Sequence, residues 1–157
     1  MGKVVVVMGS RKDVEHCRRI SSVLERFGVE CVLRIASAHK TPLKVLDIIK
    51  EYEIEEVVFI TVAGKSNALS GFVDANTTRP VIACPPYGDR FTEADIFSGL
   101  RMPSGVCPLM VLEPEQAALA ALKILGLSSE RLRKEVEKYQ QKDKRQVERD
   151  DRQIRER

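Results

Sequence analysis

The strongest constraint on the fold is a regular alternation between short apolar runs and longer segments with helical periodicity. The first run, residues 4–8, is continuously apolar and ends at Gly9-Ser10, which is typical of a strand buried on both faces of a parallel sheet. Over residues 13–27 apolar side chains recur at intervals of three and four, and Gly28 follows as a helix stop. The chain therefore begins with a strand and a helix that packs on the sheet.

The same alternation continues to about residue 125. We predict further strands over 29–36, 57–63, 80–84 and 107–112, and helices opening at Thr41-Pro42 and spanning 91–100 and 114–125. A polar loop over 64–71 is expected to lead into one more, short helix. Strands that alternate with helices in this way form right-handed βαβ units on a parallel sheet. The predicted fold is a three-layer α/β/α sandwich of flavodoxin-like type.

The 157 residues divide by composition into an α/β domain over 1–126 and a charged helical extension over 127–157. From residue 130 onward there are eleven Lys and Arg against eight Asp and Glu, so the net charge of +3 lies entirely in the extension. A thin apolar stripe runs along it, formed by Leu132, Val136, Tyr139, Val147 and Ile154. Two interpretations remain open: a solvated helical tail, or a helix that packs on a neighbouring subunit.

Several classes of function are disfavoured by what the sequence lacks. No apolar run approaches the ~20 residues of a membrane span and no signal-peptide pattern opens the chain, so we expect a cytoplasmic protein without membrane contact. The four Cys form no C-x-x-C pair and the two His are far apart, which disfavours metal binding. The loop over 64–71 has neither G-x-G-x-x-G nor G-x-x-x-x-G-K-[ST], so NAD and ATP have no supporting motif. With no Trp and a tail whose positive charge is nearly balanced by acidic residues, we expect no nucleic-acid partner. Because the motifs for NAD, ATP and metal are missing, we also expect no cofactor.

Polar residues follow each of the first four predicted strands, at the sheet edge where open α/β folds bind ligands. The four loops are 9–13, 37–41, 64–67 and 85–89. Gly9-Ser10 before a helix suits a phosphate, although the pattern is equally explained by a helix cap, with Ser10 or Asp13 closing the first turn. Lys40 and Lys65 on neighbouring loops favour the phosphate interpretation.

His39 is the best candidate for moving a proton, because it lies in a polar loop beside Lys40 rather than on an apolar helix face. The alternative is that His39 is an exposed side chain without a function. For His16, in the first predicted helix, we adopt that alternative. Other acid-base candidates at this edge are Asp13, Asp89 and Glu113. Ser66 and Asn67 suit hydrogen bonds to a planar heterocycle or a carboxylate, or else cap the next helix.

Five motifs in order resemble the phosphoribosylaminoimidazole carboxylase family of purine biosynthesis, over about residues 4–126. They are Gly9-Ser10-x-x-Asp13, Ser37-Ala38-His39-Lys40, Ala63-Gly64-Lys65-Ser66-Asn67, Cys84-Pro85-Pro86 and Met102-Pro103-Ser104-Gly105. The mutase class of that family has Arg where this chain has Lys40, and carries a His in the third loop where this chain has residues 68–71. The sequence therefore is similar to class II, the aminoimidazole ribonucleotide (AIR) carboxylases.

The resemblance implies carboxylation of AIR at C4 by carbon dioxide, giving 4-carboxy-AIR (CAIR) in IMP biosynthesis, without ATP, biotin or metal. It implies that His39 takes the C4 proton. The nucleotide is then bound by Ser10, Asp13, Ser37, Lys40, Gly64, Ser66 and Asn67. Asp13 is expected on the ribose hydroxyls, and Ser10, Ser37 and Lys40 toward the phosphate.

Further residues follow from the same resemblance. Met102 and Ser104 are expected to line the base and carbon dioxide pocket beside Asn67. Lys12 stands where the family usually has a small hydroxyl residue, and it is a possible anion ligand together with Lys65. The family also implies a homo-oligomer, an octamer or tetramer, with sites shared between subunits.

Two other functions compete with the carboxylase. The first is the N5-carboxy-AIR mutase, which moves a carboxylate from the exocyclic amine to C4. The second is a non-catalytic flavodoxin-like module that binds a phosphorylated ligand. A response-regulator role is disfavoured, because neither residues 4–8 nor 57–63 end in an acidic cluster.

Overall fold

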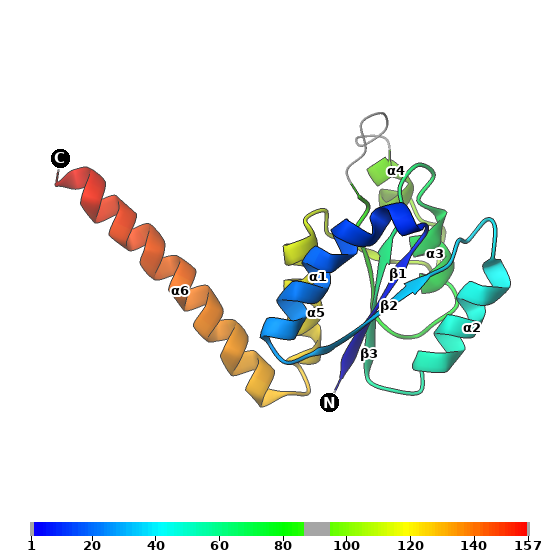
Figure 1. Ribbon diagram of the computed structural model, residues 1–157, viewed down its shortest axis with the longest axis horizontal. Helices are drawn as coiled ribbons and strands as arrows, with labels where there is room; N and C mark the ends of the chain where they lie inside the picture. Colours follow the sequence, from blue (N-terminus) through cyan, green and yellow to red (C-terminus); the bar gives the residue numbers. More distant parts are fainter. Residues whose placement is uncertain (1, 87–94, 157) are drawn as a thin grey trace.

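The computed structural model describes residues 2–86 and 95–156 and contains a five-stranded, fully parallel sheet (Figure 1). The strand order is β2-β1-β3-β4-β5, the order of flavodoxin-like folds. The strands are β1 (Lys3–Met8), β2 (Glu30–Ile35), β3 (Val57–Val62), β4 (Val81–Ala83) and β5 (Leu109–Met110). From β1 the chain first adds β2 on one side and then β3 on the other side, so the strand order reverses between β1 and β3. The site described below lies at this switch point.

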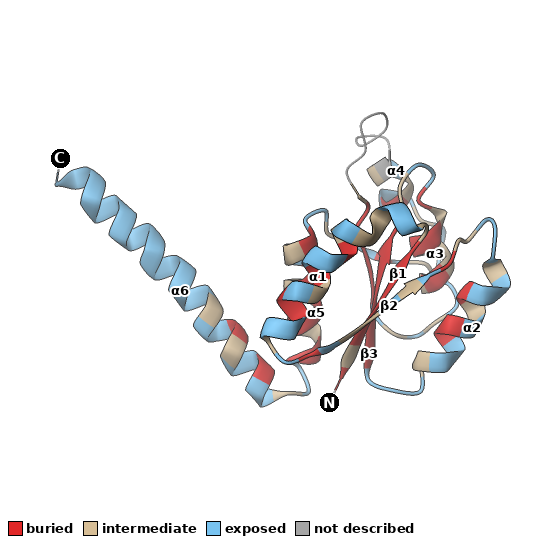
Figure 2. Ribbon diagram, viewed as in Figure 1, coloured by how far each residue is buried: buried red, intermediate tan, exposed pale blue. Residues whose placement is uncertain are grey.

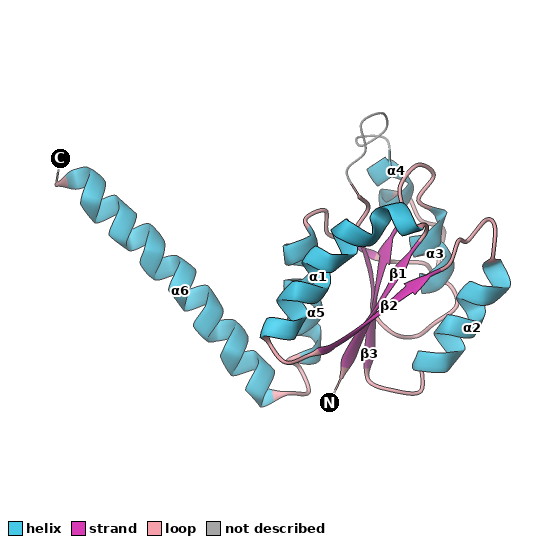
Figure 3. Ribbon diagram, in the orientation of Figure 1, coloured by secondary structure: helices cyan, strands magenta, loops and turns pink. Residues whose placement is uncertain are grey.

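Helices cover both faces of the sheet (Figure 3), which confirms the predicted three-layer architecture. They are α1 (Val14–Arg26), α2 (Pro42–Tyr52), α3 (Ala68–Asp74), α4 (Asp95–Leu100), α5 (Pro114–Leu125) and α6 (Glu130–Arg155), with a 3₁₀ turn η1 (Arg11–Asp13) before α1. Side chains of β1 alternate between two cores, because successive residues of a strand point to opposite faces. Val4 and Val6 pack in the core that includes α1 and α5 residues, whereas Val5 and Val7 pack in the core that includes α2 and α3 residues.

The helix stop predicted at Gly28 is confirmed by its backbone. Gly28 has φ +65°, a left-handed conformation that glycine adopts without a Cβ clash. Its N–H donates to the carbonyl of Glu25, and the N–H of Val29 donates to that of Leu24. These bonds satisfy the last carbonyls of α1 and turn the chain directly into β2.

Some element boundaries differ from the prediction. Helix α3 begins at Ala68, inside the segment 64–71 that was predicted as loop. The last strand is only Leu109–Met110, because its neighbour β4 is itself only Val81–Ala83 and pairs with it at Leu109 and Met110 alone. Of the helix predicted over 91–100, only α4 lies within the described residues, and Asp89 lies outside them.

The extension forms one continuous helix, α6, which projects away from the sandwich (Figures 1 and 2). Ser129 caps it by accepting a hydrogen bond from the N–H of Leu132. Leu132 and Val136 belong to the core that includes α1 and α5 residues. The rings of Tyr139 and Phe27 pack edge to face, with their centroids 5.8 Å apart. Beyond that point α6 is exposed, including Val147 and Ile154. In the described part of the chain, no helix has the length and apolar character needed to cross a bilayer.

Candidate active site

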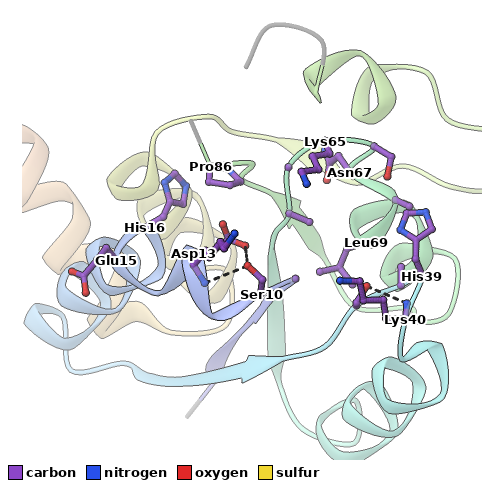
Figure 4. Close-up of a pocket in the computed structure, with 18 of the residues that line it drawn as sticks. Ser10, Asp13, Glu15, His16, His39, Lys40, Lys65, Asn67, Leu69 and Pro86 are labelled. Atoms are coloured by element: carbon purple, nitrogen blue, oxygen red, sulfur yellow. Dashed lines mark hydrogen bonds between the residues drawn. The ribbon is translucent and has the colours of Figure 1, made fainter. Parts of the chain in front are cut away.

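A cavity of about 1160 Å³ opens at the carboxyl ends of the strands, beside the switch point (Figure 4). All four predicted loops contribute to its wall, from Gly9 after β1, Ser37 after β2, Gly64 after β3 and Pro86 after β4. Of the predicted site residues, it is lined by Ser10, Lys12, Asp13, Ser37, His39, Lys40, Gly64, Lys65, Ser66 and Asn67. The topology thus brings together predicted site residues that are up to 57 positions apart in the sequence, from Ser10 to Asn67.

The first loop presents a hydroxyl and a carboxylate. Ser10 caps η1, since its Oγ accepts a hydrogen bond from the N–H of Lys12 at 3.2 Å, and the same Oγ donates to Oδ2 of Asp13 at 3.4 Å. Capping and lining the cavity are therefore compatible roles for Ser10. Burial raises the pKa of Asp13, although the bonds from Ser10 oppose this shift. Asp13 is a half-buried acceptor that faces the cavity.

The second loop is a tight turn that holds His39 and Lys40 at the opposite side of the cavity. The N–H of Lys40 donates to Ser37 Oγ at 3.2 Å, and the N–H of Ser37 donates to Thr41 Oγ1 at 2.9 Å. These bonds fix the backbone before Pro42 begins α2. The side chains of His39 and Lys40 are exposed and line the cavity. A ligand bound there can contact His39 as a proton carrier and Lys40 as a cation.

The third loop carries two residues with left-handed backbone, Lys65 at φ +60° and Asn67 at φ +45°. Asn67 is only 2% exposed, yet neither Nδ2 nor Oδ1 has a hydrogen-bond partner among the described residues. An unsatisfied buried amide is costly, and non-glycine residues at positive φ concentrate at functional sites. Because Asn67 also lines the cavity, its amide is suited to a ligand's donor and acceptor. The predicted capping role is absent, since Asn67 makes no side-chain cap bond to α3.

The structure adds cavity residues that sequence reasoning missed, chiefly on α1. Glu15, His16 and Arg19 line the cavity together with Asp13. His16 was assigned no role, yet it is half-buried there and its Nε2 lies 3.3 Å from Cys84 Sγ. The available signal was its spacing: His16 follows Asp13 by three positions and so shares a helix face with it.

Two expected residues are not brought to this cavity. Met102 and Ser104 are absent from its lining, and the Met102 side chain instead lies against Gly71 of α3.

The predicted acid-base candidate Glu113 forms an ion pair with Arg19 at 3.6 Å, while Arg19 makes two 2.8 Å hydrogen bonds to Glu115. Over residues 2–86 and 95–156, no three His, Cys, Asp or Glu side chains come together as a metal site.

Comparison with known proteins agrees with this geometry. A family model described as AIR carboxylase matches residues 3–146. The chain belongs to the AIR carboxylase family. Among the relatives of this AIR carboxylase family member, a protein of Archaeoglobus fulgidus named phosphoribosylaminoimidazole carboxylase is 58% identical over 98% of this chain and 85% of its own. A Treponema denticola protein of the same name is 46% identical over 94% of each chain.

The family fold is shared as well. The crystal structure of Treponema denticola PurE superposes with a TM-score of 0.94 at 44% identity, covering 98% of both chains. That coverage includes most of α6 as well as the sandwich. The flavodoxin-like architecture predicted for this AIR carboxylase family member is thereby confirmed.

Proposed function

We propose that the protein is an AIR carboxylase of purine biosynthesis, which reversibly adds carbon dioxide to C4 of AIR to give CAIR. The observation that carries the proposal is one cavity, in a chain of this family, that unites the Ser-Ala-His-Lys loop, the Gly-Lys-Ser-Asn loop, Ser10 and Asp13. We further propose that the enzyme acts in the cytoplasm and needs no ATP or other cofactor.

The nucleotide fits the cavity by chemistry. Lys40 and the hydroxyls of Ser10 and Ser37 supply a cation and donors for the phosphate, with Lys12 and Lys65 as further cations on the wall. The half-buried carboxylate of Asp13 suits the ribose hydroxyls, which are donors. Gly64 and Ser66 offer backbone and hydroxyl contacts, and the unpaired amide of Asn67 suits the aminoimidazole or the new carboxylate.

In the proposed reaction, the protein has to position the two substrates and to accept one proton. AIR is an enamine, so C4 is nucleophilic and attacks the carbon of carbon dioxide. A C–C bond forms, and the π electrons of one C=O bond of carbon dioxide move to its oxygen, which gives the carboxylate. The C4 proton then leaves to His39, its bonding pair restores the aromatic ring, and His39 passes the proton to solvent. Holding AIR and carbon dioxide together contributes through proximity.

The mutase is the alternative within the fold, and the names of the relatives favour the carboxylase. The test is to mix protein with AIR and carbon dioxide, without ATP, and to follow CAIR formation by ultraviolet absorbance. We expect formation above the rate without enzyme, and a loss of about 10² in turnover in His39→Asn. Conversion of N5-carboxy-AIR faster than its own decay, with no use of carbon dioxide, would instead support the mutase.

We also propose that the protein is a homo-oligomer, an octamer or tetramer, in which α6 packs on a neighbouring subunit. The support is the apolar stripe of α6: its first half is buried on the sandwich, whereas Val147 is 69% and Ile154 75% exposed. A helix this polar needs an apolar partner to hold the far half of its stripe. In such an assembly, we propose that Met102 and Ser104 contribute to sites shared between subunits. Mass measurement by light scattering tests the assembly.

A further inference from the structure

His16 occupies a defined position at the α1 end of the cavity. It lies one helical turn after Asp13, and Figure 4 shows the two side chains on the same side of the pocket, across from His39 and Lys40. Its ring is half-buried, and Nε2 lies 3.3 Å from the sulfur of Cys84, which follows β4. His16 is thus part of the cavity wall but far from the proposed proton carrier.

Cys84 anchors the imidazole. Burial raises the pKa of the Cys84 thiol to about 12, so it keeps its proton throughout the neutral range. The thiol also lies 3.5 Å from the carbonyl of Leu112, to which it donates. With its proton directed to Leu112, the sulfur can accept from Nε2–H of His16, so that the neutral ring is held in one tautomer.

The charged groups around His16 come from three elements. Burial lowers the pKa of His16 and the cation of Arg19 on α1 acts in the same direction, while a hydrogen bond to Cys84 after β4 and the carboxylates of Asp13 before α1 and Glu113 before α5 oppose the shift. The carboxylate of Glu115 on α5 also interacts electrostatically with His16. The electrostatic link to Asp13 is mutual, because His16 also lowers the pKa of that carboxyl. Protonating His16 therefore places a new cation beside the Asp13 carboxylate.

We propose that His16 is a positioning residue, which acts on substrate through Asp13. When His16 is neutral, the Asp13 carboxylate is available to the ribose hydroxyls; when His16 is protonated, its imidazolium attracts the carboxylate and competes with the ribose for it. This inference rests on the proposed function, in which Asp13 binds the ribose. It assigns the pH dependence of AIR binding in part to His16, separately from the proton transfer at His39.

The test measures AIR dissociation constants by calorimetry in carbon-dioxide-free buffer between pH 5.5 and 8, for the wild type and His16→Gln. Glu25→Gln, an exposed charge change on α1 outside the cavity, is the matched control. We expect wild-type and control binding to weaken by about tenfold more than His16→Gln binding on going from pH 8 to pH 5.5. Protonation of the AIR phosphate affects all three proteins alike. At pH 8 the kinetic effect of His16→Gln is expected to fall on the KM for AIR rather than on kcat, because His16 acts on binding through Asp13 and not on the proton transfer.

A second measurement uses the unmutated protein. It has two His, so His39→Asn assigns the imidazole signals in NMR spectra. We expect AIR to lower the pKa of His16 further, since bound ribose withdraws Asp13 from the imidazolium. Equal pH dependence in wild type and His16→Gln, or an unchanged His16 titration on AIR binding, would overturn the inference while AIR binding itself upholds the proposed function. No AIR binding by wild type at any pH would overturn both.

Discussion

Asn67 offers a direct test of how the cavity is prepared for its ligand. Replacing Asn67 with Gly removes the buried, unpaired amide and gives the φ of +45° to a residue that adopts it freely. The amide costs about 1–3 kcal/mol in the empty site, and left-handed backbone adds about 1 kcal/mol or less for Asn. A glycine costs about 0.5–1 kcal/mol in unfolded-chain entropy. We therefore expect the free energy of unfolding without ligand to rise by about 0–3.5 kcal/mol.

The same change is expected to weaken AIR binding. Two lost hydrogen bonds at about 0.5–1.5 kcal/mol each correspond to a rise in Kd of roughly 5- to 150-fold. AIR at 100 times the wild-type Kd stabilises wild type by about 2.7 kcal/mol. In Asn67→Gly, with Kd raised about 50-fold, the same AIR concentration adds less than about 1 kcal/mol.

The assay is urea denaturation with and without AIR, at one protein concentration. Lys65→Gly is the stability control, because it relaxes a positive φ of +60° at an exposed side chain without removing a buried amide. A loss of more than about 1 kcal/mol in ligand-free Asn67→Gly, with AIR stabilisation equal to that of wild type, would refute the assignment of Asn67 to the ligand.

Further predictions concern proton transfer, assembly and thiol reactivity. His39→Asn should keep the Kd for AIR within about threefold while turnover falls by about 10², and equal turnover would remove His39 from the mechanism. Val147→Glu should lower the molecular mass seen by light scattering, whereas Lys144→Glu on the same exposed half of α6 should not; an unchanged mass in both would show that the stripe is not an interface. Iodoacetamide at pH 8 should modify exposed Cys107 first, since burial raises the pKa of the other three thiols to about 12 and leaves them protonated. Earlier modification of Cys84, mapped by mass spectrometry, would contradict its role as a buried anchor.

The alternation of apolar runs and helical periods was sufficient to predict the layers of the sandwich. It was also sufficient to place Ser10, Ser37, His39 and Asn67 on one edge, because parallel strands bring their following loops together. The start of α3 at Ala68 was missed, since the polar residues before it extend the appearance of a loop.

Side-chain environment was harder to predict than topology. The role of His16 depends on Cys84, which is 68 positions away, and no local pattern reports that contact. The unpaired state of the Asn67 amide is likewise a tertiary property, decided by burial rather than by the loop sequence. The position of Met102 is a tertiary property too: its side chain lies against Gly71 of α3, and it is not among the residues that line the cavity.

The central claim is that this cavity joins carbon dioxide to C4 of AIR. The most direct measurement supplies AIR and ¹³C-labelled carbon dioxide without ATP and follows the label by NMR. The account predicts a labelled carboxylate on C4, formed faster than without enzyme and slowed about 10²-fold in His39→Asn. Label that enters C4 no faster than in the enzyme-free control, while added unlabelled N5-carboxy-AIR is converted to unlabelled CAIR, would contradict it.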